Sequence, residues 1–177
     1  MEDLNPTAAS LLGFLAGGVA MSGWELAGLT DVAIGPFWNV TRSQIYRELR
    51  DLADRGLVEP GPPGRRDRVP YSITTTGRQA FSAWIAQAPG PDLIRHRLLL
   101  TVLFADHLPA GRLREILTEQ RAGHTAQRDA YRRLEPAVEA GPAAATLAFG
   151  IAYEEMVLTW MDDVAMPLAR RRRRTDR

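Results

Sequence analysis

The fold of this chain is decided by residues 41–74, which have the sequence TRSQIYRELRDLADRGLVEPGPPGRRDRVPYSIT. The segment opens with a capping box, since the Thr41 hydroxyl can accept a hydrogen bond from the Gln44 amide while the Gln44 side chain returns to the cap. Gly56 is a natural left-handed residue at the end of a helix. The pattern predicts a helix from Thr41 to about Arg55.

Two short β-prone runs follow this helix and flank a tip rich in glycine, proline and arginine. The first run is 57–59 and the second is 68–73. Their arrangement predicts a hairpin with a long loop. Pro70 has no N–H to donate, which favours an edge position for the second strand. Thr74 is then the cap of a further helix that runs through Ala86.

The rest of the chain is predicted to be helical on both sides of this segment. Ala88-Pro-Gly-Pro91 is the best linker candidate. The helices are expected at 7–17, at 22–29 behind a serine cap at Ser22, and at roughly 92–106, 110–134 and 142–169. Three helices, a hairpin and a fourth helix describe a winged helix-turn-helix. We therefore expect a mostly α chain with a winged helix-turn-helix domain at 1–88, which carries a two-stranded wing, an all-helical domain at 89–170, and a basic tail at 171–177.

The composition excludes several kinds of chemistry. All 22 basic side chains of the 177-residue chain are arginine, and there is no cysteine. The absence of lysine excludes a P-loop lysine and a Schiff-base lysine. The absence of cysteine excludes disulfides, thiolate nucleophiles and zinc sites built on sulfur. The three histidines have no metal-ligand spacing, and no serine elbow or glycine-rich phosphate loop occurs. We therefore expect no enzyme activity, no metal and no cofactor.

Charge is distributed unevenly along a chain whose formal net charge is only +1. The sums over 1–40, 41–88, 89–169 and 170–177 are −4, +3, −3 and +5. One basic segment thus coincides with the helix and hairpin, and a second is the tail, Arg170–Arg174 and Arg177. The tail either reaches DNA or is a cationic helix end favoured by the macrodipole.

The helix from Thr41 has a polar face suited to double-stranded DNA. At 100° per residue, Ile45, Leu49 and Leu52 lie within about 60° of one another and form the inward stripe. The outward residues are polar in the N-terminal half, as in a helix whose N-terminal end enters the major groove. Either these arginines only solvate a surface, or they contact DNA; Tyr46, likewise, contacts DNA or packs against the wing. The DNA-binding candidates are Arg42, Ser43, Gln44, Tyr46, Arg47 and Arg50 on the helix and Arg65, Arg66 and Arg68 at the wing tip.

Four motifs resemble those of the PadR family of winged-helix transcriptional regulators. They are LLGFL at 11–15, SGWEL at 22–26, SQIYREL at 43–49 and YSITTTGR at 71–78. Residues 97–105 and 149–161 resemble the all-helical C-terminal domain of the longer, virulence-activator-like members. The resemblance implies a homodimer that binds operator DNA, most simply as a repressor, and that responds to a small hydrophobic or aromatic effector.

Three positions depart from the family pattern. Ser22 stands where histidine is usual, Trp24 where tyrosine is usual, and Arg47 where proline is frequent. The first two preserve packing but change any polar contact made there. Arg47 adds a reader of bases or phosphates, so the family's operator preference does not transfer.

The last predicted helix has more apolar surface than one supporting layer requires. Its two stripes span an arc of about 220°, which favours burial against a second subunit. The stripe of aromatic and methionine residues is either plain core or the lining of an effector pocket at the dimer centre. The candidates for a dimer interface or effector pocket are Phe149, Tyr153, Met156, Trp160 and Met161. Glu154, Glu155, Asp162 and Asp163 are expected on the wet side of the same helix.

The helix at 110–134 has a seam with 3–4 spacing. Its members are Leu113, Leu117, Gln120, His124, Gln127, Tyr131 and Leu134. The polar residues in the middle either set the register of helix packing or are simply exposed. No apolar stretch approaches the roughly 20 residues of a membrane span, and Glu2 and Asp3 replace the basic start of a signal peptide. We expect a cytoplasmic DNA-binding regulator without membrane contact; the alternative is a winged-helix protein-interaction module that does not bind DNA.

Overall fold

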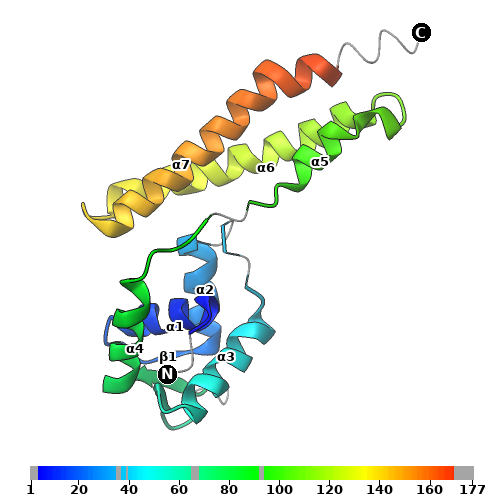
Figure 1. The fold of residues 1–177 in the computed structure, drawn as a ribbon. Helices are drawn as coiled ribbons and strands as arrows, with labels where there is room; N and C mark the ends of the chain where they lie inside the picture. The colour runs from blue at the N-terminus through cyan, green and yellow to red at the C-terminus, as the bar shows by residue number, and fades with distance from the viewer. Residues whose placement is uncertain (1–3, 35–36, 39, 65–67, 92–93, 170–177) are drawn as a thin grey trace. The chain divides into compact units, whose positions relative to one another are not determined.

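The computed structural model describes residues 4–34, 37–38, 40–64, 68–91 and 94–169. The chain divides into two compact units, residues 1–91 (unit 1) and residues 92–177 (unit 2) (Figure 1). The fold class predicted from the sequence is confirmed: the chain is mostly helical and has one small antiparallel sheet next to the helices of unit 1.

Unit 1 is a winged helix-turn-helix. Its helices are α1 (Pro6–Leu15), α2 (Gly23–Ile34), α3 (Arg42–Asp54) and α4 (Thr75–Ile85), and its strands are β1 (Met21–Ser22), β2 (Val58–Pro60) and β3 (Pro70–Ile73). Three of the helices begin at side-chain caps: Asn5 accepts from the Ala8 amide, Thr41 from Gln44, and Thr74 from Gly77. Each cap satisfies a backbone N–H that the helix itself leaves without a partner.

The sheet corrects one sequence-based expectation and adds a strand. Its order is β1-β3-β2, so β3 is the central strand and the edge position expected from Pro70 is wrong. Pro70 is tolerated because it is the first residue of β3 and because its carbonyl accepts from the Gly61 amide at 2.7 Å, a bond that needs no proline N–H. The third strand, Met21–Ser22, is too short to show a period of two, so no alternation could reveal it.

The core of unit 1 gathers one face of each of its first three helices and the start of β2. The fully or almost fully buried side chains are Leu11, Leu12, Leu15, Leu26, Ile45, Leu49, Leu52 and Val58. Phe81 and Trp84 of α4 pack on this core from outside, and Arg78 of α4 donates to the carbonyl of Ala16 at 2.7 Å. That bond satisfies a carbonyl at the end of α1 and ties α4 to it.

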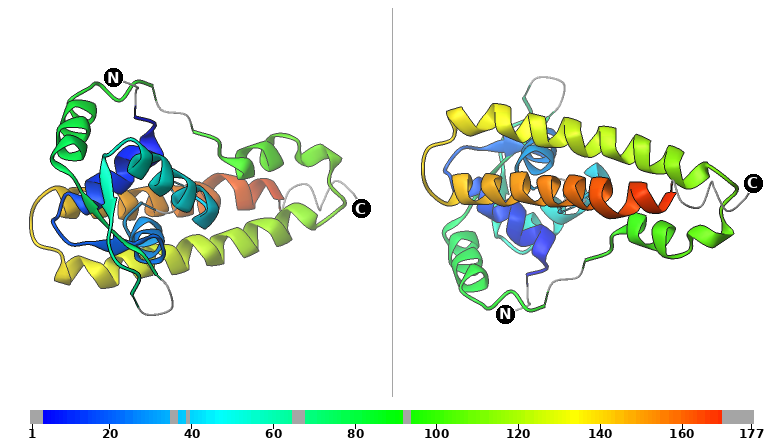
Figure 2. Two further views of the ribbon diagram at one scale, coloured as in Figure 1. Left: turned by 90° about the horizontal axis from the view of Figure 1, so that it is seen from below. Right: turned by 90° about the horizontal axis from the view of Figure 1, so that it is seen from above.

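Unit 2 is built on a pair of long antiparallel helices that lie side by side in both views of Figure 2. They are α6 (Arg112–Leu134) and α7 (Pro142–Trp160). A π-helical turn, η4 (Met161–Ala165), follows α7, and helical structure continues to residue 169. The remaining elements are α5 (Arg97–Leu103) and the 3₁₀ turns η2 (Ala105–His107) and η3 (Glu135–Ala137).

The core of unit 2 joins α5, α6 and α7. Its buried members include Leu98, Leu113, Leu117, Val157, Met161 and Ala165. The sequence predicts a helix over 92–106, but α5 is shorter: its N-cap is His96 and it ends at Leu103. None of the described helices is long and apolar enough to cross a membrane.

The junction between α3, β2 and α4 is the tightest point in unit 1. The Thr74 hydroxyl donates toward the carbonyls of Gly56 (2.8 Å) and Leu57 (3.1 Å) and accepts from the Gly77 amide at 2.9 Å. A Cβ on Gly77 would lie 2.1 Å from the Leu57 carbonyl oxygen. The backbone of α4 can therefore approach the end of α3 only because residue 77 has no side chain.

We expect Gly77→Ala to lower the free energy of unfolding by about 3 kcal/mol, because the new methyl group meets backbone that cannot rotate away. Gly28→Ala is the matched control: it lies exposed within α2, nothing is within 4 Å of its added Cβ, and alanine favours helix there. Thermal and urea unfolding of both variants measure the difference. Equal stabilities would contradict this account of the junction.

Candidate nucleic-acid interface

The polar face of α3 is turned outward by the three apolar side chains on its opposite face. Ile45, Leu49 and Leu52 are buried in the core of unit 1. Since they fix the rotation of the helix, the N-terminal polar positions must face solvent. Arg42, Ser43, Tyr46, Arg47 and Arg50 are all exposed, as the sequence predicts, and Gln44 is half-buried.

Two of the predicted DNA-binding side chains also have structural contacts. The Gln44 amide oxygen accepts from the Thr41 N–H at 2.8 Å and the Thr41 hydroxyl at 3.0 Å, so that oxygen is committed to the cap. The ring of Tyr46 lies against Gly23, where an added Cβ would be 2.6 Å from the ring. Tyr46 thus packs on the start of α2 and keeps part of its ring exposed.

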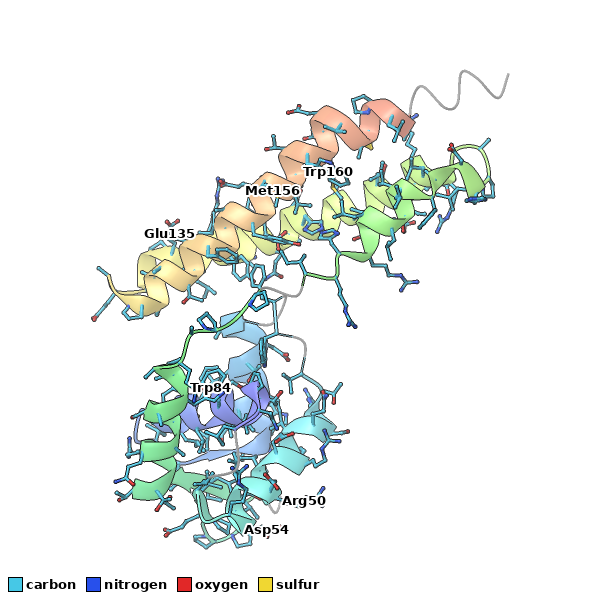
Figure 3. All side chains as sticks on the ribbon, viewed as in Figure 1. Arg50, Asp54, Trp84, Glu135, Met156 and Trp160 are labelled. Atoms are coloured by element: carbon cyan, nitrogen blue, oxygen red, sulfur yellow. The ribbon has the colours of Figure 1, made fainter. Side chains whose placement is uncertain are left out.

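The arginines on α3 differ in how firmly they are held. The Arg47 side chain is 68% exposed and has only a 4.0 Å contact with Glu48. Arg50 donates from Nε to the Tyr46 carbonyl at 3.3 Å, which holds its base along the helix. Figure 3 shows Arg50 and Asp54 in the C-terminal half of α3. Arg47 is therefore a largely available cation on this face, whereas the carboxylate of Asp54 would repel phosphate at the C-terminal end of the helix.

The wing begins as a regular hairpin whose tip lies outside the described residues. The Gly61 amide donates to the Pro70 carbonyl at 2.7 Å and the Gly64 amide to the Arg68 carbonyl at 2.8 Å. Arg65 and Arg66, two of the three predicted wing contacts, fall in the undescribed segment 65–67. The third, Arg68, is half-buried, with its guanidinium carbon 4.1 Å from the centre of the Trp24 ring.

A second capping arrangement fixes the start of α2. Glu25 accepts from the hydroxyl of Ser22 at 2.7 Å and from its amide at 2.8 Å. The hydrogen bond from the Ser22 hydroxyl, then the one from its amide, and also the charge of Arg68 lower the pKa of the Glu25 carboxyl. The S-x-x-E spacing of Ser22 and Glu25 is a sequence signal for this arrangement, in which the glutamate is as important as the predicted serine cap.

The predicted dimer or effector residues of α7 do not share one environment. Phe149 and Met156 are 62% and 56% exposed, whereas Tyr153 and Trp160 are half-buried against the core of unit 2. Met161, the first residue of the π-helical turn after α7, is completely buried in that core together with Ala165, which agrees with the plain-core alternative for this residue.

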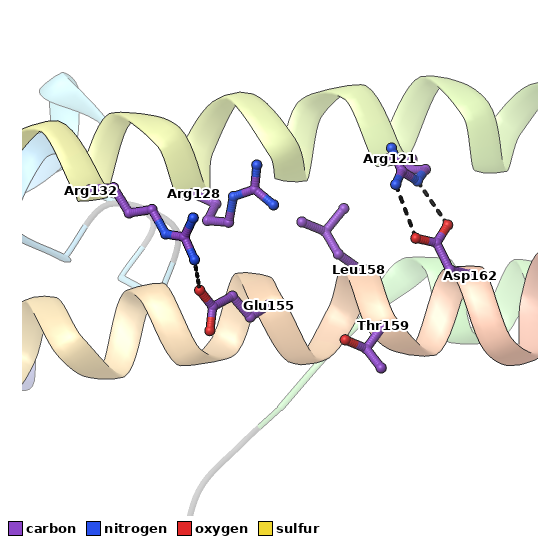
Figure 4. Close-up of a pocket in the computed structure, with 7 residues that line it drawn as sticks. All are labelled: Arg121, Arg128, Arg132, Glu155, Leu158, Thr159 and Asp162. Carbon is purple, nitrogen blue, oxygen red and sulfur yellow. Dashed lines mark hydrogen bonds and ion pairs between the residues drawn. The ribbon is translucent and has the colours of Figure 1, made fainter.

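A polar groove of about 400 Å³ lies between α6 and α7 (Figure 4). Two ion pairs cross it: Arg121 binds Asp162 through two hydrogen bonds of 2.8 and 3.0 Å, and Arg132 binds Glu155. Arg128 lies between them and pairs with its neighbour Asp129. None of the aromatic residues predicted for an effector pocket lines this groove.

A buried cluster of ionisable side chains lies inside unit 2. Glu154 is only 2% exposed, so its expected position on the wet side of α7 is wrong. Its carboxylate is 2.5 Å from Nδ1 of His124. The His124 ring is stacked with the ring of His96, and the two ring centroids are 6.3 Å apart. His124 and Tyr131 thus form the inner seam of α6, while Gln120 of the same predicted seam is exposed.

The surroundings of His96 in this cluster lower the pKa of its imidazole. Burial lowers its pKa below the ordinary value, the positive charge of His124 lowers it further, and Glu154 opposes the shift. Its Nδ1 is buried and has no hydrogen-bond partner within the described part of the chain. The phenol groups of Tyr131 and Tyr153 also border the cluster, and burial raises the pKa of each. No group of side chains in the described ranges has an arrangement that could hold a metal ion.

We expect unit 2 to lose stability as the pH falls from about 7.5 to 5. The unfolded chain protonates His96 near its ordinary pKa of about 6.5, whereas the folded chain resists protonation, so the unfolded state binds more protons as acid is added. Urea unfolding of His96→Gln should show a shallower decline than the parent. His107→Gln, at an exposed histidine outside the cluster, should keep the parent's decline; identical curves for all three proteins would contradict the assignment.

Comparison with known proteins places the chain among bacterial regulators. A family model described as the C-terminal region of virulence activator alpha matches residues 94–168. A probable transcriptional regulator of Mycobacterium tuberculosis is 31% identical over 175 residues, which cover 86% of this chain and 93% of that protein. The match thus extends over both units.

Solved structures show the same fold. Bacillus subtilis PadR in complex with operator DNA has a TM-score of 0.73 at 21% identity, covering 89% of this chain and 96% of that one. The same protein in complex with p-coumaric acid has a TM-score of 0.67 at 22% identity, covering 89% and 95%. The Vibrio cholerae virulence activator AphA has a TM-score of 0.69 at 23% identity, covering 92% and 97%. With its capped α3, its arginine-tipped wing and its helical unit 2, the chain belongs to the PadR family of winged-helix transcriptional regulators.

Proposed function

We propose that this regulator binds double-stranded DNA as a homodimer, with unit 1 as the DNA-binding domain and unit 2 as the dimerisation domain. The observation that carries the proposal is the face of α3, where exposed Arg42, Ser43 and Arg47 stand on a capped helix anchored by three buried side chains. Such a helix offers its N-terminal residues to the major groove without needing to order itself. The complex of Bacillus subtilis PadR with operator DNA supports the same assignment.

The side chains of this face suit different parts of a DNA site. Arg47 is long, planar and largely exposed, and an arginine on a recognition helix can donate two hydrogen bonds to guanine. Ser43 and the Gln44 amide nitrogen are shorter donors that suit either bases or phosphates. Arg42, at the first turn, and Arg50, held along the helix, suit the phosphates that flank the groove. Arg65 and Arg66 would extend the contact from the wing.

Dimerisation is supported by apolar surface that unit 2 leaves exposed on two of its helices. On α7 and the π-helical turn after it this surface includes Phe149, Met156 and Val164, and on α5 and its C-cap it includes Leu99, Leu100, Leu103 and Phe104. Large apolar side chains gathered on helix faces indicate a protein partner, and a second copy is the simplest partner of this kind. Two DNA-binding units related by a two-fold axis would recognise a roughly palindromic operator.

The regulator would act in the cytoplasm as a repressor that a small hydrophobic or aromatic compound releases from DNA. Tyr153 and Trp160 are half-buried on α7 beside the exposed Phe149 and Met156, so an aromatic compound that entered there would meet apolar and ring surfaces. The complex of Bacillus subtilis PadR with p-coumaric acid supports an effector of this class. Fluorescence anisotropy of DNA binding, repeated with planar aromatic acids added, measures the release of the protein from DNA directly.

Fluorescence anisotropy with a duplex from the protein's own promoter tests DNA binding. We expect Arg47→Ala to reduce discrimination between operator and unrelated duplex by about 1–3 kcal/mol, because it removes a base contact. Arg66→Ala should weaken binding to both duplexes alike and lower the slope of log K against log salt by about 0.9, because one phosphate contact is lost.

Arg114→Ala is the control for loss of positive charge, since Arg114 is exposed on α6 in unit 2. It should leave both affinity and salt slope unchanged. If neither Arg47→Ala nor Arg66→Ala changes DNA affinity, discrimination or salt slope, the proposed interface is refuted. A partner protein that binds equally well without these arginines, with no binding of DNA at moderate salt, would instead establish the interaction module.

Light scattering tests the proposed dimer. The parent should have twice the 19.6 kDa mass of the chain, and the double variant Phe149→Glu/Met156→Glu should be monomeric, because two carboxylates would be buried in an apolar interface. Ala148→Glu adds one such carboxylate, half the charge of the double variant, at an exposed position on the side of α7 that includes Glu155, and should remain dimeric. A parent that is monomeric at all concentrations would exclude this mode of assembly.

A further inference from the structure

The Arg68 side chain is held by unit 1 itself at the place where the wing leaves the sheet. Its guanidinium carbon lies 4.1 Å from the centre of the Trp24 ring, well within cation–π distance. Trp24 is 47% exposed and belongs to the first turn of α2, whereas Arg68 is half-buried. An arginine that acts chiefly on phosphate would instead extend into solvent.

Both the backbone and the side chain of Arg68 lie at the base of the wing tip. Its carbonyl accepts from the Gly64 amide at 2.8 Å, a bond that joins the two sides of the wing at this point. Two residues later, Pro70 pairs with Ser22 of β1 and accepts from Gly61 of the other wing strand. The base of the tip is therefore joined to the sheet on one side and to α2 on the other.

The electrostatic surroundings of Arg68 favour this position. The hydrogen bonds from the Ser22 hydroxyl and amide are the main causes that lower the pKa of the Glu25 carboxyl, and the charge of Arg68 lowers it further, so the two side chains attract each other. Glu25 is fixed by those two hydrogen bonds from Ser22. The guanidinium thus lies over an aromatic face and is attracted by an anchored carboxylate, two features that hold a cation in place.

We propose that the Trp24–Arg68 stack is a clamp that sets the direction of the wing, and that Arg68 is a positioning residue for DNA binding rather than a phosphate contact. The inference rests on the proposed DNA-binding function. A clamped wing would approach DNA already in its bound direction, whereas a released wing would lose conformational freedom on binding and so bind more weakly. Trp24, which stands where the family usually has tyrosine, thereby acquires a role at a distance from the recognition helix.

Two readouts test the clamp in the full-length protein. The first is hydrogen exchange of the Gly64 amide without DNA, which reports whether its bond to the Arg68 carbonyl opens. We expect Trp24→Leu and Arg68→Gln each to accelerate that exchange several-fold, whereas Trp24→Tyr, which retains an aromatic face, should stay within about twofold of the parent. Because no DNA is present, this readout stands even if the proposed function fails.

The second readout is DNA affinity and its salt dependence for the two single variants and the double variant. A clamp predicts that each single variant binds about fivefold more weakly, that the double variant binds no more weakly than either, and that all three keep the parent's salt slope. A parent that fails to bind DNA would refute the proposed function and leave the exchange result to decide the clamp.

A direct phosphate contact predicts a different pattern. Arg68→Gln would then lower the salt slope by about 0.9, while Trp24→Leu would leave affinity unchanged or increase it, because the arginine is released toward DNA. That pattern, or effects of the two single variants that multiply in the double variant, would overturn the clamp. Unchanged exchange of the Gly64 amide in both single variants would overturn it as well.

Discussion

The rotation of α3 about its own axis is the constraint on which the function of unit 1 depends. Ile45, Leu49 and Leu52 are buried on one side, and turning the helix would expose them and bury arginines instead. Each such leucine or isoleucine contributes about 1.5–3 kcal/mol by its burial, so the helix has one strongly preferred orientation. The direction of the polar face of α3 is therefore determined by the side chains buried on the opposite face.

The other elements of unit 1 hold that orientation in place. The Thr41 cap fixes where α3 begins, and the bonds of Thr74 to the carbonyls of Gly56 and Leu57 fix where the chain goes after the helix ends. Gly77 lets α4 approach that junction. Because β2 and β3 leave from the same junction, the position of the wing follows from the position of α3.

The sequence predicts those parts of the fold that depend on neighbours along the chain. The Thr41 and Thr74 caps, the hairpin and the buried stripe of α3 all have short-range patterns, and each lies where it was expected. The wrong expectation for Pro70 involves a partner far away in sequence, because β3 is central only through its pairing with Met21–Ser22. The contact of Arg68 with Trp24 is another long-range relation that no local pattern contains.

The core of unit 2 also depends on a contact that no local sequence pattern reveals. The sequence predicts Glu154 as one of several acidic residues on a solvated helix face. Its burial follows from His124 on α6, thirty residues away in the chain. Burying a carboxylate is costly unless it is paired, so the pair contributes more to register than to net stability. A slip of α7 by one turn, about 5.4 Å, would leave Glu154 buried without its partner. It would also break the two-bond pair of Arg121 and Asp162. Apolar contacts alone tolerate such a slip, so these polar pairs specify how α6 and α7 align, and with that alignment which apolar side chains of unit 2 stay exposed.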